Sequence, residues 1–253
     1  MSKSKKKLTK FILNICLLIG FVGIIYCVYS IINLYKDNNS TKKMIEKIQL
    51  EVIEKFPVTS AKKDDNVTQT QESIDLTLDF EKLSKINNDT VAWIKVSGTN
   101  IDYPIVQTTN NNYYLNHSFD KTKNQNGWPF LNSDNAKDFS DHNTILFGHN
   151  TNGTTMFSQL KDIYNGKYGT SIDIYIYLEN EVIQYQVFSI YLEEPTNVSS
   201  ISKFITSDII SKSIEKSKIK FGIDVSDKDY ILTLSTCNNV TDDRIIMQAK
   251  KVI

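Results

Sequence analysis

The longest apolar stretch of the chain lies close to its N-terminus. It runs from Phe11 to about Ile32, which matches the roughly 20 residues that a helix needs to cross a bilayer. No small-residue cleavage site of the A-x-A kind follows it, so we interpret the stretch as an uncleaved membrane anchor. The alternative is a long secretory signal with an atypical cleavage site.

The charges on either side of this stretch predict its orientation. Five lysines precede it, and a mixed Lys36–Asp37 pair follows it. Positively charged flanks stay on the cytoplasmic side of a membrane. We therefore predict a single-pass protein of the cell membrane, with its N-terminus inside and everything from about residue 36 onward on the extracellular face.

Two segments separate the predicted anchor from the rest of the chain. Thr41 to Phe56 places apolar residues on one stripe and charged residues on the other, which predicts a helix that packs on the domain or forms a stalk. Pro57 to about Ser73 is polar and has little to bury, so we expect a linker or exposed loop. The predicted organisation is a tail and anchor over residues 1–35, a helix and linker over 36–75 and a globular domain over 76–253.

In the globular part, short β-type runs alternate with turn residues such as Asn126–Gly127. Eight short strands with few helices favour a mainly β fold that closes into a barrel over a doubly wound sheet. The predicted helices are Asp79–Ile86, Asn110–Asn116, Met156–Tyr164 and Ser207–Lys220, and the predicted strands are Val91–Val96, Ile101–Val106, Trp128–Leu131, Thr144–Phe147, Ser171–Leu178, Val182–Tyr191, Tyr230–Leu234 and Ile245–Lys250.

Composition narrows the class of partners. The 29 basic residues balance 29 acidic ones, whereas a nucleic-acid-binding protein typically carries a basic surplus, so we expect no nucleic-acid partner. The chain has no metal-ligand spacing of the C-x-x-C or H-E-x-x-H kind and no glycine-rich phosphate loop, so we predict neither a metal nor a cofactor.

Cysteine usage points to a reactive thiol. Cys16 and Cys27 lie inside the apolar run, where they behave as small hydrophobic residues. Cys237 is then the only cysteine of the exported part, and it has no partner for the disulfides that exported domains commonly form. It follows the strand-like run Tyr230–Thr236, where a side chain is held by the sheet yet open to solvent. We consider Cys237 a candidate nucleophile, with a buried, inert cysteine as the alternative.

A cysteine nucleophile needs a proton partner, because its ordinary pKa of about 8.5 leaves only a few per cent as thiolate at neutral pH. His149 directly follows the run Thr144–Gly148, so its imidazole also projects from a strand end. We therefore predict that His149 pairs with the cysteine. His117 and His142 are the alternatives.

Arg244 is the only arginine among the basic residues. It follows Cys237 across a polar loop, and a hairpin-like return places it at the start of the last strand, beside Cys237. Attack on an amide develops a negative oxygen, to which a forked guanidinium can donate twice. The alternatives are a chance surface position and an ion pair with Asp242 or Asp243.

Four separated motifs resemble those of class B sortases, and the resemblance runs from about residue 76 to the C-terminus. The run Leu232–Cys237 followed by Arg244 resembles the sortase signature, a TLxTC strand end with a downstream arginine. Phe147–Asn150 resembles the histidine segment of that class. The remaining similar segments are Asp79–Asp89, Trp93–Ile94, Ile101–Gln107 and Asn111–Leu115.

The resemblance implies a fold and a reaction. The fold is an eight-stranded sortase barrel with the Ser207–Lys220 helix between two late strands, and residues 76–253 are its catalytic domain. In the implied reaction Cys237 attacks a backbone carbonyl in the C-terminal sorting motif of an exported protein, of the Asn-Pro-x-Thr-Asn type, and forms a thioacyl-enzyme. An amine of the cell-wall precursor then takes the acyl group.

The resemblance also assigns residue roles. His149 protonates the leaving amine and activates the accepting one, while Arg244 holds the oxyanion together with backbone amides. By motif position, Asn111, Leu115 and Ser235 line the groove for the sorting peptide.

Two other readings of the sequence stay open. A cell-wall peptidase or L,D-transpeptidase also pairs an exported cysteine with a histidine, although its signature places a Gly before the cysteine where this chain has Ser-Thr. A membrane-anchored binding module without catalytic activity would keep Cys237 as a core residue.

Overall fold

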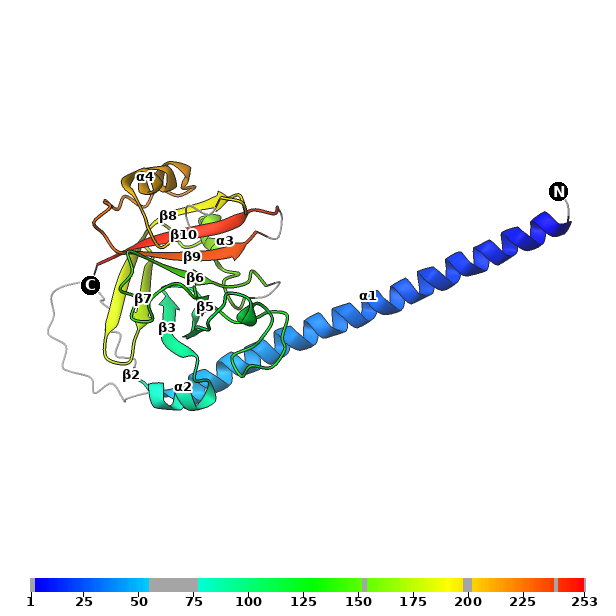
Figure 1. Ribbon diagram of the computed structural model, residues 1–253, viewed down its shortest axis with the longest axis horizontal. Helices are drawn as coiled ribbons and strands as arrows, with labels where there is room; N and C mark the ends of the chain where they lie inside the picture. The colour runs from blue at the N-terminus through cyan, green and yellow to red at the C-terminus, as the bar shows by residue number, and fades with distance from the viewer. Residues whose placement is uncertain (1–2, 55–76, 152–153, 198–201, 239–240, 253) are drawn as a thin grey trace, which may run out of the picture. The chain divides into compact units, whose positions relative to one another are not determined.

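The structure, a computed structural model, describes residues 3–54, 77–151, 154–197, 202–238 and 241–252 (Figure 1). The chain divides into two compact units, Met1–Ser40 and Thr41–Ile253. The linker predicted over residues 57–73 lies outside the described residues.

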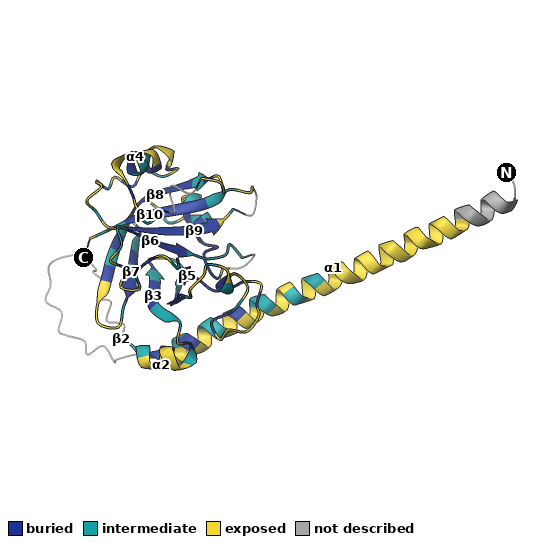
Figure 2. Cartoon of the chain, in the orientation of Figure 1, coloured by how far each residue is buried: buried dark blue, intermediate teal, exposed yellow. Residues whose placement is uncertain are grey.

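Helix α1 (Lys3–Val52) contains the predicted anchor. Its apolar side chains from Phe11 to Ile32 are exposed, as the yellow stretch in Figure 2 shows. Within the described part of the chain, α1 is the one helix long and apolar enough to cross a membrane. This suggests a membrane anchor.

The predicted amphipathic helix is the last part of α1 and not a separate element. No glycine or proline occurs between Lys36 and Thr41, so nothing interrupts the helical hydrogen bonds there. The helix also ends before Phe56: Ile53–Glu54 form strand β1, which pairs antiparallel with β2 (Thr77–Leu78). Residues 55 and 56 lie outside the described ranges.

A closed barrel of eight strands forms the second unit, and the predicted fold class is confirmed. Its order is β10-β8-β7-β3-β4-β5-β6-β9. Two of the neighbouring pairs are parallel, β4 with β5 and β6 with β9, and the other neighbouring pairs are antiparallel. The strands are β3 (Thr90–Val96), β4 (Asp102–Val106), β5 (Phe130–Leu131), β6 (Asn143–Phe147), β7 (Asp173–Tyr177), β8 (Val182–Glu193), β9 (Ile231–Cys237) and β10 (Arg244–Lys251).

The core fills the barrel with aliphatic and aromatic side chains. Trp93 and Trp128 are both buried, and each indole N–H donates a hydrogen bond, to the Asp102 carboxylate at 2.7 Å and to the Pro104 carbonyl oxygen at 2.8 Å. Helix α2 (Phe80–Ile86) begins at Asp79, whose carboxylate accepts from the backbone N–H of Lys82 at 2.9 Å. Because both indole N–H groups have hydrogen-bond acceptors, burying these tryptophans stabilises the barrel without leaving an unpaired donor inside it.

Several predicted elements are shorter in the structure. The predicted helix Asn110–Asn116 is a single 3-10 turn, η1 (Tyr113–Leu115). The predicted helix Met156–Tyr164 contains only α3 (Leu160–Tyr164), because Met156 has φ of 56° and pairs with Asn150 in an isolated β-bridge. The strand predicted from Trp128 begins at Phe130, since Pro129 has no N–H to donate to a ladder.

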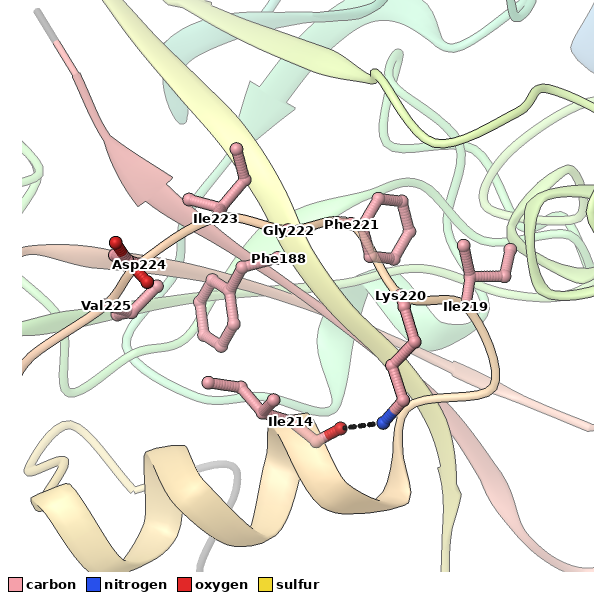
Figure 3. A pocket seen from close by; sticks show the side chains of 9 residues that line it. All are labelled: Phe188, Ile214, Ile219, Lys220, Phe221, Gly222, Ile223, Asp224 and Val225. Carbon is pink, nitrogen blue, oxygen red and sulfur yellow. Dashed lines mark hydrogen bonds between the residues drawn. The ribbon is translucent and has the colours of Figure 1, made fainter.

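Helix α4 (Ser207–Lys216) lies over β8, where a helix was predicted, but ends four residues earlier than Lys220. Between its end, Phe188 of β8 and the segment Ile219–Val225 lies a pocket of about 340 Å³ (Figure 3). Its lining is mostly apolar, and it includes none of the predicted site residues.

Candidate active site

Cys237 and Arg244 lie directly opposite each other in the antiparallel pair β9 and β10. Opposite residues in such a pair place their side chains on the same face, with Cβ atoms about 5 Å apart. The thiol of Cys237 is exposed, and Arg244 is half-buried. The chain therefore returns after Cys237 as predicted, and Arg244 begins the last strand. This return brings the only arginine of the chain beside the thiol.

The parallel pair β6 and β9 brings His149 to the same edge of the barrel. Phe147 is in register with Ser235, and the N–H of Gly148 donates to the Ser235 carbonyl oxygen at 3.2 Å. His149 and Cys237 each lie two residues beyond this pair. Because parallel strands end at the same edge, both side chains project there.

The imidazole of His149 is held by the backbone. Its Nε2 lies 2.7 Å from the carbonyl oxygen of Leu115. A carbonyl oxygen can only accept, so Nε2 carries the proton and Nδ1 is left to exchange a proton at the site.

The turn that carries the Leu115 carbonyl is itself fixed. Tyr114 is buried, accepts from the Asn87 amide at 2.7 Å and donates to the Asp89 carboxylate at 2.8 Å. Burial raises the pKa of Tyr114 well above its usual range, so its hydroxyl remains a donor at neutral pH. The acceptor for His149 is therefore part of a rigid, hydrogen-bonded turn.

Two further residues support the site and were not predicted. The side-chain amide of Asn150 donates to the carbonyl oxygen of Cys237 at 2.9 Å and so ties the histidine segment to the end of β9. Gly127 has φ of 59°, and a Cβ there would lie 2.9 Å from Cδ2 of His149. The only signals in the sequence were the place of Asn150 after His149 and the turn pair Asn126–Gly127.

A pocket of about 260 Å³ brings together all six predicted site residues. Its lining includes Ser235, which is buried and whose hydroxyl has no hydrogen-bond partner among the described residues. Asn111 uses its side chain within the pocket wall, donating to Asn132 and accepting from the N–H of Ser133, both at 2.8 Å. The lining residues are Asn111, Asn112, Leu115, Phe130, Phe147, Gly148, His149, Ser235, Cys237 and Arg244.

The alternative histidines lie elsewhere. His117 stacks on the ring of Tyr113, with ring centroids 4.1 Å apart, and its Nδ1 lies 2.7 Å from the Tyr113 carbonyl oxygen. His142 meets the edge of Tyr230, with ring centroids 5.5 Å apart, just before β6 begins and so at the opposite end of that strand from His149. Neither histidine lines the pocket with Cys237.

The alternative ion pair of Arg244 is also not seen. Asp243 accepts from the hydroxyl of Thr241 at 2.7 Å, and within the described ranges the guanidinium has no carboxylate within 4.0 Å. In the same part of the chain, no three His, Cys, Asp or Glu side chains gather as metal ligands would.

An exposed thiol beside an imidazole and a guanidinium, over an open pocket, is typical of cysteine enzymes that transfer acyl groups. The family model of the sortase domain matches residues 94–252. Sortase B of Staphylococcus aureus (strain NCTC 8325 / PS 47) is 32% identical over 254 residues, which cover 96% of this chain and 98% of that protein.

Solved structures agree with the sequence matches. Clostridium perfringens sortase B is similar with a TM-score of 0.64 and 34% identity, covering 69% of this chain and 100% of that chain. A Staphylococcus aureus sortase B-substrate complex has a TM-score of 0.61 and 34% identity, covering 68% of this chain and 84% of that chain.

The chain therefore belongs to the sortase family. Its similarity to sortase B proteins identifies it as a class B sortase, a cysteine transpeptidase, and confirms the resemblance in the motifs. These findings favour the transpeptidase over the L,D-transpeptidase and binding-module readings.

Proposed function

We propose that Cys237 is the nucleophile of this transpeptidase, that His149 is its proton partner and that Arg244 holds the oxyanion. The observation that carries the proposal is their convergence: side chains at the ends of β6, β9 and β10 line one pocket. Their residue types supply the three functions that acyl transfer requires, which are a nucleophile, an acid and base, and a donor to the oxyanion.

In the first half of the reaction, the Cys237 thiolate attacks a backbone carbonyl of the sorting motif. The C–S bond forms, and the carbonyl electron pair moves to oxygen, where the Arg244 fork donates to it. The C–N bond then breaks, and His149 gives its proton to the leaving amine through Nδ1. The product is a thioester on Cys237.

In the second half, an amine takes the place of the departed peptide. The nitrogen of the amine attacks the thioester, and Nδ1 of His149, now unprotonated, accepts the proton that the amine loses. The new C–N bond forms, the C–S bond breaks, and the thiolate of Cys237 is regenerated beside the protonated imidazole. No cofactor takes part in these steps.

The proposed partners follow from this chemistry. The acyl donor is an exported protein with a C-terminal sorting motif, bound between Asn111, Leu115 and Ser235. This assignment is supported by the pocket, because all three residues line it together with Cys237 and His149. The acceptor is an amine of the cell-wall precursor.

The proposed location is the outer face of the cell membrane. The five lysines before the apolar part of α1 favour an N-terminus inside the cell. Residues 1–35 would then be tail and anchor, 36–75 an extracellular helix and linker, and 76–253 the catalytic domain facing the cell wall.

The test uses the full chain in detergent with a panel of quenched fluorescent sorting peptides, including the Asn-Pro-x-Thr-Asn type. We expect the wild type to cleave at least one peptide, and mass spectrometry to find the acyl adduct on Cys237. Cys237→Ala should abolish both cleavage and adduct, because no other described thiol lies at the pocket.

The matched control is the double variant Cys16→Ala/Cys27→Ala, which removes the other two cysteines. It should cleave like the wild type. Full cleavage by Cys237→Ala would disprove the nucleophile, and intact turnover by His149→Ala would disprove the proton partner.

A further inference from the structure

Arg244 has a second neighbour on the same face of the barrel. In the pair β8 and β10, it lies directly opposite Glu193, just as it lies opposite Cys237 in the pair β9 and β10. Directly opposite side chains share a face and lie within reach of each other. The guanidinium therefore stands in a row between a thiol and a carboxylate.

Glu193 is a carboxylate with little access to solvent, since only 7% of the residue is exposed. Both of its oxygens accept from Nζ of Lys216, at 3.0 Å each. A buried carboxylate that loses its partner is strongly disfavoured and draws the nearest cation. The nearest cation in register is Arg244.

Arg244 nevertheless turns toward the pocket. It lines the cavity with Cys237 and His149, and its guanidinium makes no ion pair within the described parts of the chain. An arginine fork and a carboxylate ordinarily form the stronger, bidentate pair. The Lys216–Glu193 contact explains why that pair does not form here.

Lys216 is held in place by the way α4 ends. The Ser217 hydroxyl accepts from the N–H of Ile190 in β8 at 3.0 Å, and the N–H of Lys218 donates to the Ile190 carbonyl oxygen at 2.9 Å. Figure 3 shows Lys220 reaching back to the Ile214 carbonyl oxygen, at 3.0 Å. The last turn of α4 is thus fixed above β8, with the Lys216 ammonium over Glu193.

We propose that Lys216 is a positioning residue for catalysis: it neutralises Glu193, and this leaves Arg244 directed at the oxyanion. Without Lys216, the Arg244 guanidinium pairs with Glu193 across the β8–β10 ladder and withdraws from the pocket. The inference rests on the proposed role of Arg244, and it gives α4 a part in the chemistry although none of its residues lines the pocket.

The first test follows Arg244 directly. It is the only arginine of the chain, so ¹⁵N-arginine labelling of the full chain in detergent gives a single Nε–H signal. Lys216→Met should shift this signal and slow its exchange with solvent, because the pair with Glu193 protects the N–H. Adding Glu193→Gln should return the signal to its wild-type position. An unchanged signal in Lys216→Met would overturn the inference.

The second test measures the rate at which Cys237 is acylated by a sorting peptide that the wild type cleaves. Loss of one oxyanion donor typically costs about 10²–10³ in rate, and we expect Lys216→Met to lose at least tenfold. Lys216→Met/Glu193→Gln should regain most of that loss. The matched control is Lys212→Met, one turn earlier in α4, which removes an exposed pair with Asp208 at 2.7 Å and should leave the rate unchanged.

An Arg244→Met background separates positioning from folding. If Lys216 acts through Arg244, Lys216→Met has no further effect on the slow acylation that remains, whereas a general loss of folded protein lowers the rate again. A further loss overturns the inference. Full activity of Arg244→Met would instead disprove the oxyanion role proposed above, whatever the NMR signal shows.

Discussion

At the scale of single residues, the chemistry of His149 depends on backbone groups. The Leu115 carbonyl oxygen accepts the hydrogen bond from the Nε2–H of His149, and Gly127 leaves space for the ring where any Cβ would touch it. A histidine held in this way needs no carboxylate to set its tautomer, because a backbone acceptor on one nitrogen decides which nitrogen is free. The site depends on a glycine that carries no chemistry of its own.

We predict that Gly127→Ala slows acylation of Cys237 by roughly a hundredfold, because displacing a catalytic group by about 1 Å costs that much. The new Cβ would lie 2.9 Å from the His149 ring and would clash with the Tyr114 carbonyl oxygen. The control is Gly166→Ala, at φ of 82° with no atom within 4 Å, which carries backbone strain alone. Acylation rate and thermal unfolding are measured for both. Equal acylation rates in the two variants would contradict a steric role for Gly127.

Arg244→Lys tests the fork rather than the charge. Lysine keeps the positive charge but lacks the planar pair of donors, so we expect kcat to fall by about 10²–10³. The measurement is cleavage of the preferred peptide under saturating conditions. A kcat near that of the wild type would remove Arg244 from the oxyanion site.

At the scale of elements, the site exists because strands β6, β9 and β10 end or begin at one edge of the barrel. Each predicted catalytic residue is positioned by hydrogen bonds between strands, and the same strands supply side chains to the core.

Asp102, at the start of β4, is a strand residue whose charged form is destabilised by burial. Its carboxylate accepts from Trp93 at 2.7 Å, yet burial raises the pKa of Asp102 above its ordinary value.

This raised pKa predicts how stability depends on pH. An acid with a raised folded-state pKa favours the folded state while protonated, below its ordinary pKa of about 3.9, and loses that contribution as pH rises through the folded value. Asp102→Asn still accepts from Trp93 but never ionises. We therefore expect its free energy of unfolding, relative to the wild type, to be higher at pH 7 than at pH 3. Chemical denaturation at both pH values measures this, and an equal difference at each would contradict it.

At the scale of the whole molecule, α1 contributes residues to both compact units. Its first part supplies the exposed apolar run, while Thr41, Ile48 and Val52 are buried in the unit that holds the barrel. The Thr41 hydroxyl accepts from the side-chain amides of Asn124 and Asn126, at 3.1 and 3.0 Å. The end of the helix therefore belongs to the core of the second unit.

Truncation separates these two contributions. A chain that begins at residue 37 should be soluble without detergent and should cleave the sorting peptide at the wild-type rate. A chain that begins at residue 55 loses the buried side chains of α1, and its free energy of unfolding should fall by roughly 3 kcal/mol or more. Urea denaturation compares the two. Equal stability would show that the end of α1 is dispensable for the fold.

Much of the fold followed from local patterns. Period-two alternation and turn residues identified the strands because these patterns depend only on which side of a strand faces the core. The lengths of helical segments were less predictable. Met156 adopts a left-handed conformation, and the turn at Tyr113–Leu115 stays short because its backbone groups bind other parts of the chain.

The sequence by itself determined the apolar run near the N-terminus and the barrel class, and its motifs predicted Cys237, His149 and Arg244 as catalytic residues, since each depends on composition, periodicity or a motif. Only the tertiary structure decided that β6 runs parallel to β9, that Gly127 lies against the His149 ring and that Glu193 faces Arg244. A periodic pattern states which side chains face inward but not which strands become neighbours. Register and close approach are set by the packing of the whole barrel, and the surroundings of the proposed catalytic residues depend on both.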